Sequence, residues 1–307
     1  MGIDRYSLEF LIDVRKSGVE FGNTITLGRQ DLLVEYSAIE DIFQRYSIPY
    51  TEEIITNFYK TNNQFSEPLM EYIGAKNCQS IDFSDFENAN IVHDLNRPID
   101  DNLKYRFDTV IDGGTLEHVF NFPQAIKNCM EMLITGGHFI SITPTNNFMG
   151  HGFYQFSPEL FFRVLSEENG FLLKKIIFCE INSDNQWYEV LDPKVISTRV
   201  GTTSRFPCYL MLVAEKIAYS NDIFTVTPQQ SDYANEWTNK KSKGDDISRL
   251  SFWNGKISPS SRGMTSKLFF KLKTPLKLCK KLIFNKLVNK RRDIDNNKLF
   301  VPYKKMG

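Results

Sequence analysis

The order of the secondary structure expected along the chain constrains its fold more than any other feature of the sequence. From about residue 23 to residue 217, short β-branched or apolar segments alternate with longer segments whose apolar residues recur at helical spacing. The segments expected to form strands are 23–27, 78–83, 90–94, 107–112, 138–143, 172–181 and 209–215. Strands that alternate with helices are typical of a parallel sheet whose crossover helices cover both faces. We therefore expect an α/β protein with a doubly wound, mostly parallel, seven-stranded sheet.

The helices expected between these strands divide the chain further. They cover residues 4–16, 31–46, 66–73, 122–133 and 157–169. Residues 31–65 exceed what a single crossover needs, so we expect a helical insertion there. Only a loop separates the last two strands, which predicts that one of them is an antiparallel strand at the edge of the sheet.

Charge is distributed unevenly along the chain. The sequence holds 37 basic and 37 acidic side chains, yet residues 259–307 contain 14 basic and only 2 acidic ones. We expect a catalytic-type domain at 1–218, a polar linker at 219–262 and a basic tail at 263–307. Within this tail, residues 264–290 predict a basic amphipathic helix, which suits an anionic membrane surface, a protein partner or the acidic body of the same chain. A nucleic-acid partner is disfavoured, because the tail has few aromatic residues and no nucleic-acid motif.

The cysteines and the N-terminus indicate the compartment. The five cysteines are odd in number and widely spaced, and no C-x-x-C pair exists, so neither a zinc site nor a disulfide framework is predicted. The first residues carry charges throughout and lack the apolar core of a signal peptide. No apolar run approaches the roughly 20 residues that span a bilayer. We expect a cytoplasmic protein, peripheral at the inner membrane face if the tail binds lipid.

Polar residues and glycines follow each expected strand, which is where an open parallel sheet binds its ligands. Gly28 follows the first strand, Asp82 and Asp94 end the next two, and Asp112 ends the fourth. An acid at the end of the second strand is placed to accept hydrogen bonds from both hydroxyls of a ribose. Alternatively, Asp82 and Asp94 are ordinary turn aspartates with no role in binding a ligand.

One block of the sequence carries a family resemblance. Residues 107–147, FDTVIDGGTLEHVFNFPQAIKNCMEMLITGGHFISITPTNN, resemble the middle of the class I S-adenosylmethionine-dependent methyltransferases. That family has an acid-rich fourth strand, an L-E-H-V-type turn and a helix that ends in Leu-x-x-Gly-Gly, followed by an apolar strand. The resemblance extends over roughly residues 22–217. It implies a Rossmann-like sheet, S-adenosyl-L-methionine as cofactor, and methyl transfer as the reaction.

The resemblance also assigns residues to the cofactor. These are Gly28 for the methionine part, Asp82 and Phe83 for the ribose, Asp94 and Leu95 for the adenine, and Asp112 and Gly113 for the region near the sulfonium. The first loop departs from the family pattern, because it keeps one glycine and has Thr26 where the family has an acid. Arg29 and Gln30 in this loop are expected to reach the carboxylate of the cofactor. The alternative is a decayed cofactor loop in a non-catalytic, methyltransferase-like binding module.

Methyl transfer to an oxygen or nitrogen needs alignment and often a base. We expect His151 as the base, because glycines and aromatic residues surround it in the loop after the fifth strand. His118, Tyr154 and Glu117 are further candidates. A metal site from His118, His151 and Asp112 was considered, but no metal-ligand spacing supports it and none is predicted. The expected acceptor is a small molecule or a glycan intermediate, since lipid-linked sugars lie at the membrane face that the tail would contact.

Overall fold

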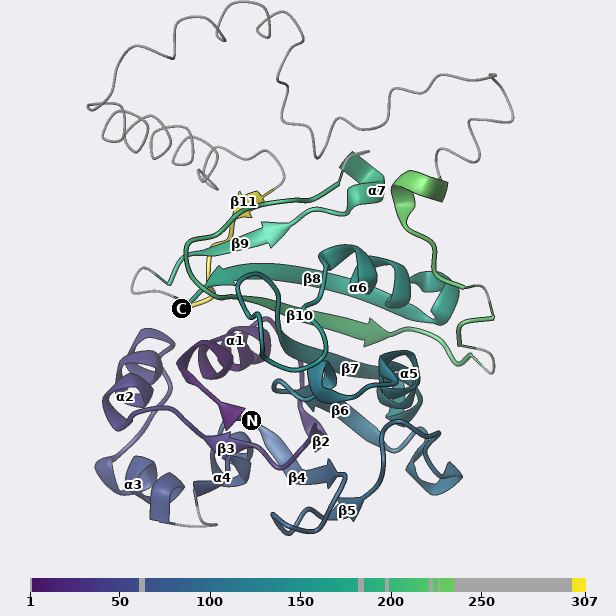
Figure 1. Cartoon of the computed structure of the whole chain (residues 1–307). Helices are drawn as coiled ribbons and strands as arrows, with labels where there is room; N and C mark the ends of the chain where they lie inside the picture. Colours follow the sequence, from purple (N-terminus) through teal and green to yellow (C-terminus); the bar gives the residue numbers. More distant parts are fainter. Residues whose placement is uncertain are drawn as a thin grey trace, which may run out of the picture.

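The computed structural model describes residues 2–60, 64–181, 185–196, 199–220, 223–225, 227–234 and 300–307 (Figure 1). The expected basic helix at 264–290 and most of the polar linker at 219–262 lie outside the described residues. None of the helices in the described part of the chain has the length and apolar character needed to cross a bilayer.

One sheet of nine strands forms the centre of the molecule. Its strands are β2 (Gly22–Leu27), β4 (Ala75–Asp82), β5 (Ile91–Val92), β6 (Phe107–Asp112), β7 (Leu133–Pro144), β8 (Phe171–Glu180), β9 (Trp187–Val190), β10 (Cys208–Lys216) and β11 (Phe300–Pro302). They lie in the order β11-β9-β8-β10-β7-β6-β2-β4-β5. Five neighbouring strands are parallel to one another: β7, β6, β2, β4 and β5. Each of the remaining strands is antiparallel to its neighbours.

The expected α/β, Rossmann-like, mostly parallel fold is confirmed, and all seven expected strands are present. Two details differ. The antiparallel strand is not at the edge, because β10 pairs with β7 on one side and β8 on the other. Its run Leu210–Ala214 is buried on both faces, because helices cover both sides of the sheet there. The sheet also gains β9 and β11, which extend it beyond β8.

Helices cover both faces of the sheet (Figure 1). The first face carries α1 (Arg5–Lys16), α2 (Tyr36–Arg45), α3 (Glu52–Lys60) and α4 (Glu67–Tyr72), and the second carries α5 (Phe122–Met132) and α6 (Pro158–Val164). A short α7 (Pro193–Ile196) follows β9. Successive strand residues divide between the two cores: Val110 packs with α5 and α6, and Ile111 packs with the helices of the first face.

The start of the expected insertion is not helical. Residues 31–35 were expected to begin a helix, but β3 (Asp31–Leu32) pairs in parallel with β1 (Gly2–Ile3), and α2 begins only at Tyr36. The N–H of Leu33 continues this pairing by donating to the carbonyl of Ile3 at 2.9 Å. Backbone pairing therefore outweighs helix formation here. It also draws the N-terminus across the carboxyl ends of the central strands.

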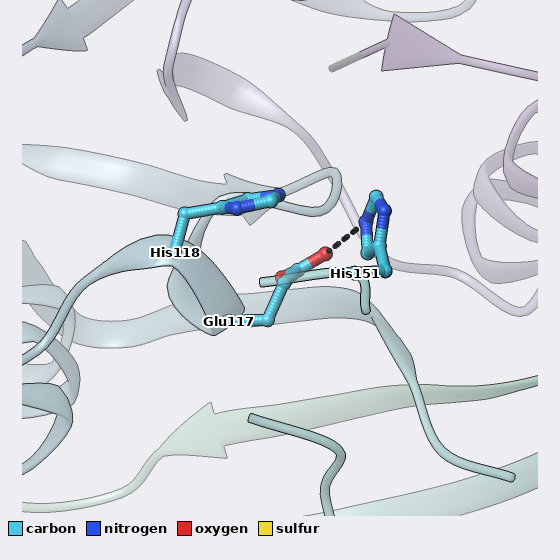
Figure 2. Close-up of side chains that lie close together, drawn as sticks. All are labelled: Glu117, His118 and His151. Carbon is cyan, nitrogen blue, oxygen red and sulfur yellow. Dashed lines mark ion pairs between the residues drawn. The ribbon is translucent and has the colours of Figure 1, made fainter. Parts of the chain in front are cut away.

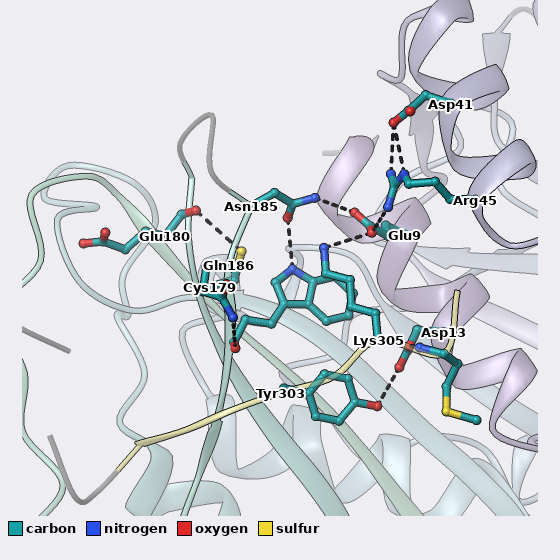
Figure 3. Close-up of polar contacts among 12 residues, drawn as sticks. Glu9, Asp13, Asp41, Arg45, Cys179, Glu180, Asn185, Gln186, Tyr303 and Lys305 are labelled. Carbon is teal, nitrogen blue, oxygen red and sulfur yellow. Dashed lines mark hydrogen bonds and ion pairs between the residues drawn. The ribbon is translucent and has the colours of Figure 1, made fainter. Parts of the chain in front are cut away.

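The last eight residues belong to the body of the protein, although the sequence analysis placed them in the basic tail. β11 pairs with β9, and the residues after it lie against α1 (Figure 3). The hydroxyl of Tyr303 donates to the carboxylate of Asp13 at 2.8 Å, and the ammonium of Lys305 donates to Glu9 at 2.9 Å. Both carboxylates are fully buried, so residues from the far end of the chain satisfy charges inside the first helix.

Candidate active site

The strand order of the sheet reverses at β2. Its neighbours are β4, which follows it along the chain, and β6, which lies on its other side. Ligands of open α/β sheets bind outside the carboxyl ends of the strands at such a point. Gly28 follows β2, Asp82 ends β4 and Gly113 follows β6, so three residues assigned to the cofactor meet at one edge.

Gly28 makes the turn that ends β2. Its φ of +67° lies in the left-handed region, where glycine is favoured. Its N–H donates to the carbonyl of Ile81 at 2.8 Å, and the hydroxyl of Thr26 donates to the carbonyl of Gly28 at 2.9 Å. Thr26, which replaces the acid of the family pattern, therefore supports the turn through its hydroxyl.

Asp82 lies half-buried beside this turn. One carboxylate oxygen accepts from the N–H of Phe83 at 2.6 Å, and the other lies 3.4 Å from the N–H of Arg29. A carboxylate has about four acceptor positions, so capacity for the hydroxyls of a ribose remains. The ring of Phe83 is 71% exposed. Asp82 is therefore suitably placed for the role that the resemblance gives it.

Asp94 has the features of a turn aspartate. Its carboxylate accepts from the side-chain amide of Asn96 at 2.7 Å and from the backbone N–H of the same residue at 3.0 Å. These hydrogen bonds from Asn96 hold the pKa of Asp94 below its ordinary value. Leu95 is buried in the core beneath this turn.

The Arg29 side chain is engaged with the protein itself, which differs from the expected role in binding a carboxylate of the cofactor. Its Nε donates to Glu67 at 2.7 Å, and its Nη1 donates to the carbonyl of Glu87 at 2.7 Å. The guanidinium also stacks on the ring of Phe65, with its carbon 4.0 Å from the ring centre. Arg29 therefore ties the loop after β2 to α4 and to the loop after β4.

Gln30 is fully buried between the ends of β2 and β6. Its amide nitrogen donates to the carbonyl of Leu27, which fixes the orientation of the side chain. Its Oε1 consequently faces Gly113, where an added Cβ would lie 2.5 Å from that oxygen. Among the described residues, Oε1 has no hydrogen-bond partner. Gln30 thus presents an acceptor, suited to an ammonium, in place of the donor that a carboxylate would need.

Asp112 organises the turn after β6 instead of facing a ligand. It is fully buried and accepts hydrogen bonds from the hydroxyl of Ser141 at 2.7 Å and from the N–H groups of Thr115 and Leu116 at 2.8 and 3.2 Å. Burial raises its pKa, and these hydrogen bonds oppose that effect. The residues of the turn that remain available to a ligand are Gly113 and Gly114.

A cavity of about 560 Å³ opens over these two glycines. It is lined by Gly2, Asp4, Ser7, Leu33, Gly113, Gly114, Glu117, His118, Ile142, Pro144, Phe148, His151 and Tyr209. The N-terminal pairing of β1 with β3 therefore supplies one wall, and the ends of β6 and β7 supply the floor. Tyr209 and Phe148 both line the cavity and stack on each other with their ring centres 5.6 Å apart, and the hydroxyl of Tyr209 donates to Asp4 at 3.1 Å.

Glu117, His118 and His151 converge in this cavity (Figure 2). Nε2 of His151 lies 3.5 Å from Oε1 of Glu117, and the two imidazole rings lie 4.9 Å apart between their centres. The carboxylate oxygen and the two ring nitrogens all lie within 4.8 Å of one another. Glu117 is buried, whereas both histidines are exposed. The sequence separates Glu117 and His118 widely from His151, so spacing alone does not reveal this cluster.

Gly152 fixes the loop that carries His151. Its φ is +69°, and a Cβ at this position would lie 2.7 Å from the carbonyl oxygen of Glu117. That same carbonyl accepts from the N–H of Phe153 at 2.7 Å. Glycine thus allows the loop after β7 to run directly over Glu117, which brings His151 to the cluster.

The electrostatics of the cluster favour the binding of a cation. Burial, together with the negative charge of Asp112, raises the pKa of Glu117 to about 8. Burial also lowers the pKa of His118, and the neighbouring His151 adds to this effect. In the described part of the chain, Oε2 of Glu117 is buried and has no hydrogen-bond partner.

Tyr154, the third catalytic candidate from the sequence, contacts Glu117 through its backbone N–H at 3.2 Å but is not among the residues that line the cavity. Its hydroxyl donates to the carbonyl of Phe120 at 2.6 Å, and its ring stacks on Phe156. Tyr154 is therefore a packing residue of the loop. The sequence did not reveal Asp4 and Tyr209, because no local motif signals either residue. Pairing of β1 with β3 brings Asp4 to the cavity, and pairing of β10 with β7 brings Tyr209 there.

No protein-family model matches the sequence, and no curated protein is similar to it at a significant level. Solved structures with a similar fold include the N-methyltransferase NodS from Bradyrhizobium japonicum in complex with S-adenosyl-L-homocysteine. It is 13% identical, the match covers 70% of this chain and 86% of NodS, and the TM-score is 0.37.

Other similar structures include the antibiotic-resistance methyltransferase Kmr, at 12% identity, with 67% of this chain and 92% of Kmr covered and a TM-score of 0.32. A variant of the branched-chain polyamine synthase from Thermus thermophilus is 10% identical, with 74% of this chain and 60% of that protein covered and a TM-score of 0.34. At such values the likeness concerns the fold alone.

Proposed function

We propose that the protein transfers a methyl group from S-adenosyl-L-methionine to an oxygen or nitrogen of a small molecule or a glycan intermediate. The observation that carries this proposal is the cluster of Glu117, His118 and His151, which lies in a cavity at the carboxyl ends of β6 and β7. The cavity borders the point where strand order reverses, which is the usual ligand site of such sheets.

The residues at the ends of β2, β4 and β6 fit the cofactor. Gly28 allows close approach to the backbone, and Asp82 offers its carboxylate to the ribose hydroxyls. The unpartnered oxygen of Gln30 faces Gly113 and suits the ammonium of the methionine part. The cofactor supplies a methyl group on a positive sulfonium, which leaves as a neutral thioether once the methyl carbon is bonded to the acceptor.

The Glu117–His151 pair can accept the proton that the acceptor must lose. When the C–O or C–N bond forms, the acceptor proton passes to the free ring nitrogen of His151. The carboxylate of Glu117 stabilises the resulting imidazolium, because its Oε1 lies 3.5 Å from Nε2 of His151. The glycines of the turn after β6 leave room for the acceptor beside this pair.

Two features support the acceptor class: exposed apolar side chains near the cluster and a basic segment of the sequence. Phe120, Met149 and Phe153 are 72%, 95% and 65% exposed in the loops that carry the cluster, and such apolar side chains suit an amphipathic acceptor such as a lipid-linked sugar. The basic segment 264–290 would hold the protein at an anionic membrane surface on the cytoplasmic side. Replacing Lys277 and Lys281 by Gln should weaken sedimentation with phosphatidylglycerol vesicles, and wild-type protein that never sediments would refute this attachment.

A second candidate function is a non-catalytic binding module. One observation favours it: the hydroxyl of Thr115 donates to the carbonyl of Leu27 at 2.6 Å, so the crevice between β2 and β6 is bridged by the protein itself. Cofactor binding would then require this bridge to open. A module that never opens it would bind neither the cofactor nor its product.

Calorimetry with S-adenosyl-L-homocysteine distinguishes the two functions. We expect binding to the full chain, and we expect Asp82→Asn to weaken it by about 10- to 100-fold, because a hydrogen bond to a charged group contributes about 1.5–3 kcal/mol. Asp85→Asn is the matched control, since Asp85 is an exposed acid in the same loop. No heat at millimolar ligand would refute the methyltransferase and support the binding module.

A further inference from the structure

We propose that Glu117, His118 and His151 together bind a divalent transition-metal ion, such as Zn²⁺, Mn²⁺ or Fe²⁺. The binding of the ion follows from the geometry of the cavity alone. Only its catalytic consequence rests on the methyl transfer proposed above.

The positions of the three ligand atoms are close to those that an ion would impose. Metal–nitrogen and metal–oxygen bonds of about 2.0–2.2 Å require ligand atoms roughly 3.0–3.5 Å apart. Oε1 of Glu117 and Nε2 of His151 are already 3.5 Å apart, and all three ligand atoms lie within 4.8 Å of one another. Both histidines are exposed, so rotation of their side chains closes the remaining distance without repacking the core.

In the described part of the chain, Glu117 has little positive charge around it to balance a buried carboxylate. Its side chain is 1% exposed, and His151 is its only ion-pair partner in the described part of the chain. Oε2 of Glu117 accepts no hydrogen bond from any described residue. Among the charges that act on Glu117, the carboxylate of Asp112 has the largest effect, and it is also negative. An ion at the cluster would supply the missing positive charge.

The ligand set selects the kind of ion. Two imidazoles and one carboxylate suit zinc, manganese, iron and cobalt, whereas Mg²⁺ and Ca²⁺ prefer oxygen ligands. Three protein ligands leave coordination positions open, as in catalytic metal sites. The cluster lines the cavity, so those positions would face the space in which an acceptor lies.

The ion would change the role of His151. The ion would stabilise the negative oxygen of an acceptor hydroxyl bound at an open position and so favour loss of its proton to water in the cavity. His151 would then be a ligand of the ion instead of the base, and the methyl group would still pass from the sulfonium sulfur to the acceptor oxygen.

Metal titration of the full chain tests the inference. Protein treated with a chelator and dialysed is titrated with ZnCl₂, MnCl₂ and MgCl₂ by calorimetry. We expect one Zn²⁺ or Mn²⁺ per chain with micromolar or tighter affinity, and no comparable binding of Mg²⁺. His118→Ala and Glu117→Gln should each weaken binding at least 10-fold, while His93→Ala, which changes a histidine that contacts Arg97 elsewhere, leaves it unchanged.

Two results would overturn the inference: wild-type protein that binds none of these ions, or a His118→Ala variant that is folded by circular dichroism and binds as tightly as the wild type. S-adenosyl-L-homocysteine binding on the same samples separates this outcome from the proposed function. Metal binding without cofactor-product binding contradicts the methyltransferase and supports the metal site. Product binding without metal binding contradicts the metal site, and His151 then keeps the role of base.

Discussion

The contact of Lys305 with Glu9 yields a prediction for the attachment of the C-terminus. The ammonium of Lys305 lies 2.9 Å from Oε1 of Glu9, and Glu9 is fully buried in α1. The same ammonium lies 4.1 Å from the ring centre of Trp187. Lys305→Met keeps the apolar stem over the ring but removes the charge, so it isolates the two electrostatic contacts.

The size of the effect follows from these two contacts. A hydrogen bond to a charged group contributes about 1.5–3 kcal/mol, and a cation over an aromatic ring about 0.5–1 kcal/mol. Arg45 and Asn185 remain on Glu9 and limit the loss. We therefore expect the free energy of unfolding to fall by about 2–3 kcal/mol. For a folded body of roughly 200–250 residues this lowers Tm by about 4–10 °C.

The matched control is Lys304→Met. Lys304 is the neighbouring residue, carries the same charge and is exposed, so its replacement should change stability by less than about 0.5 kcal/mol. Thermal unfolding followed by circular dichroism, with urea titration of the same samples, measures both variants. Equal Tm values for the two variants would refute the claim that Lys305 holds the C-terminus on α1.

Two further predictions concern the loop and the response to acid. Gly152→Ala should reduce stability by about 1–3 kcal/mol and also reduce methyl transfer, because the added Cβ would meet the carbonyl of Glu117. The control is Gly150→Ala: Gly150 has a φ of +88° but open space around it, so the added Cβ should cause backbone strain alone. Burial would raise the pKa of Glu9, but hydrogen bonds from Arg45 and Lys305 outweigh it and hold that pKa below the ordinary value of 4.5. At acid pH the unfolded chain therefore binds more protons than the folded one, so stability should fall as the pH drops below about 4.5. Urea titration across this pH range should show a shallower fall for Glu9→Gln than for the wild type.

Periodicity was sufficient to predict the parallel half of the sheet. β2, β6 and the second half of β7 are buried almost throughout, so their β-branched and apolar runs stand out between amphipathic helices. The position of β10 inside the sheet could not be derived, because hydrogen-bond partners on either side of a strand leave no local signal. β11 was missed because it is short and is separated from β9 by more than a hundred residues.

The candidate site was predicted in outline. Polar strand ends located the edge of the sheet, and His118 and His151 do lie together there. The roles of Arg29 and Asp112 differ from the sequence-based assignment, because both side chains are engaged by neighbours that only tertiary structure supplies: Glu67 for the first and Ser141 for the second. The importance of Glu117 lies in its burial, which a sequence motif does not report.

The most direct test of the proposed function is methyl transfer itself. The protein is incubated with S-adenosyl-L-methionine and deproteinised aqueous and lipid extracts of its source cells, and formation of S-adenosyl-L-homocysteine is measured. We expect product formation that depends on the extracts and is lost in His151→Ala, because His151 completes the cluster as base or as metal ligand. Product formation that is equal in wild type and His151→Ala, or absent from both, would contradict the proposal that this cavity performs methyl transfer.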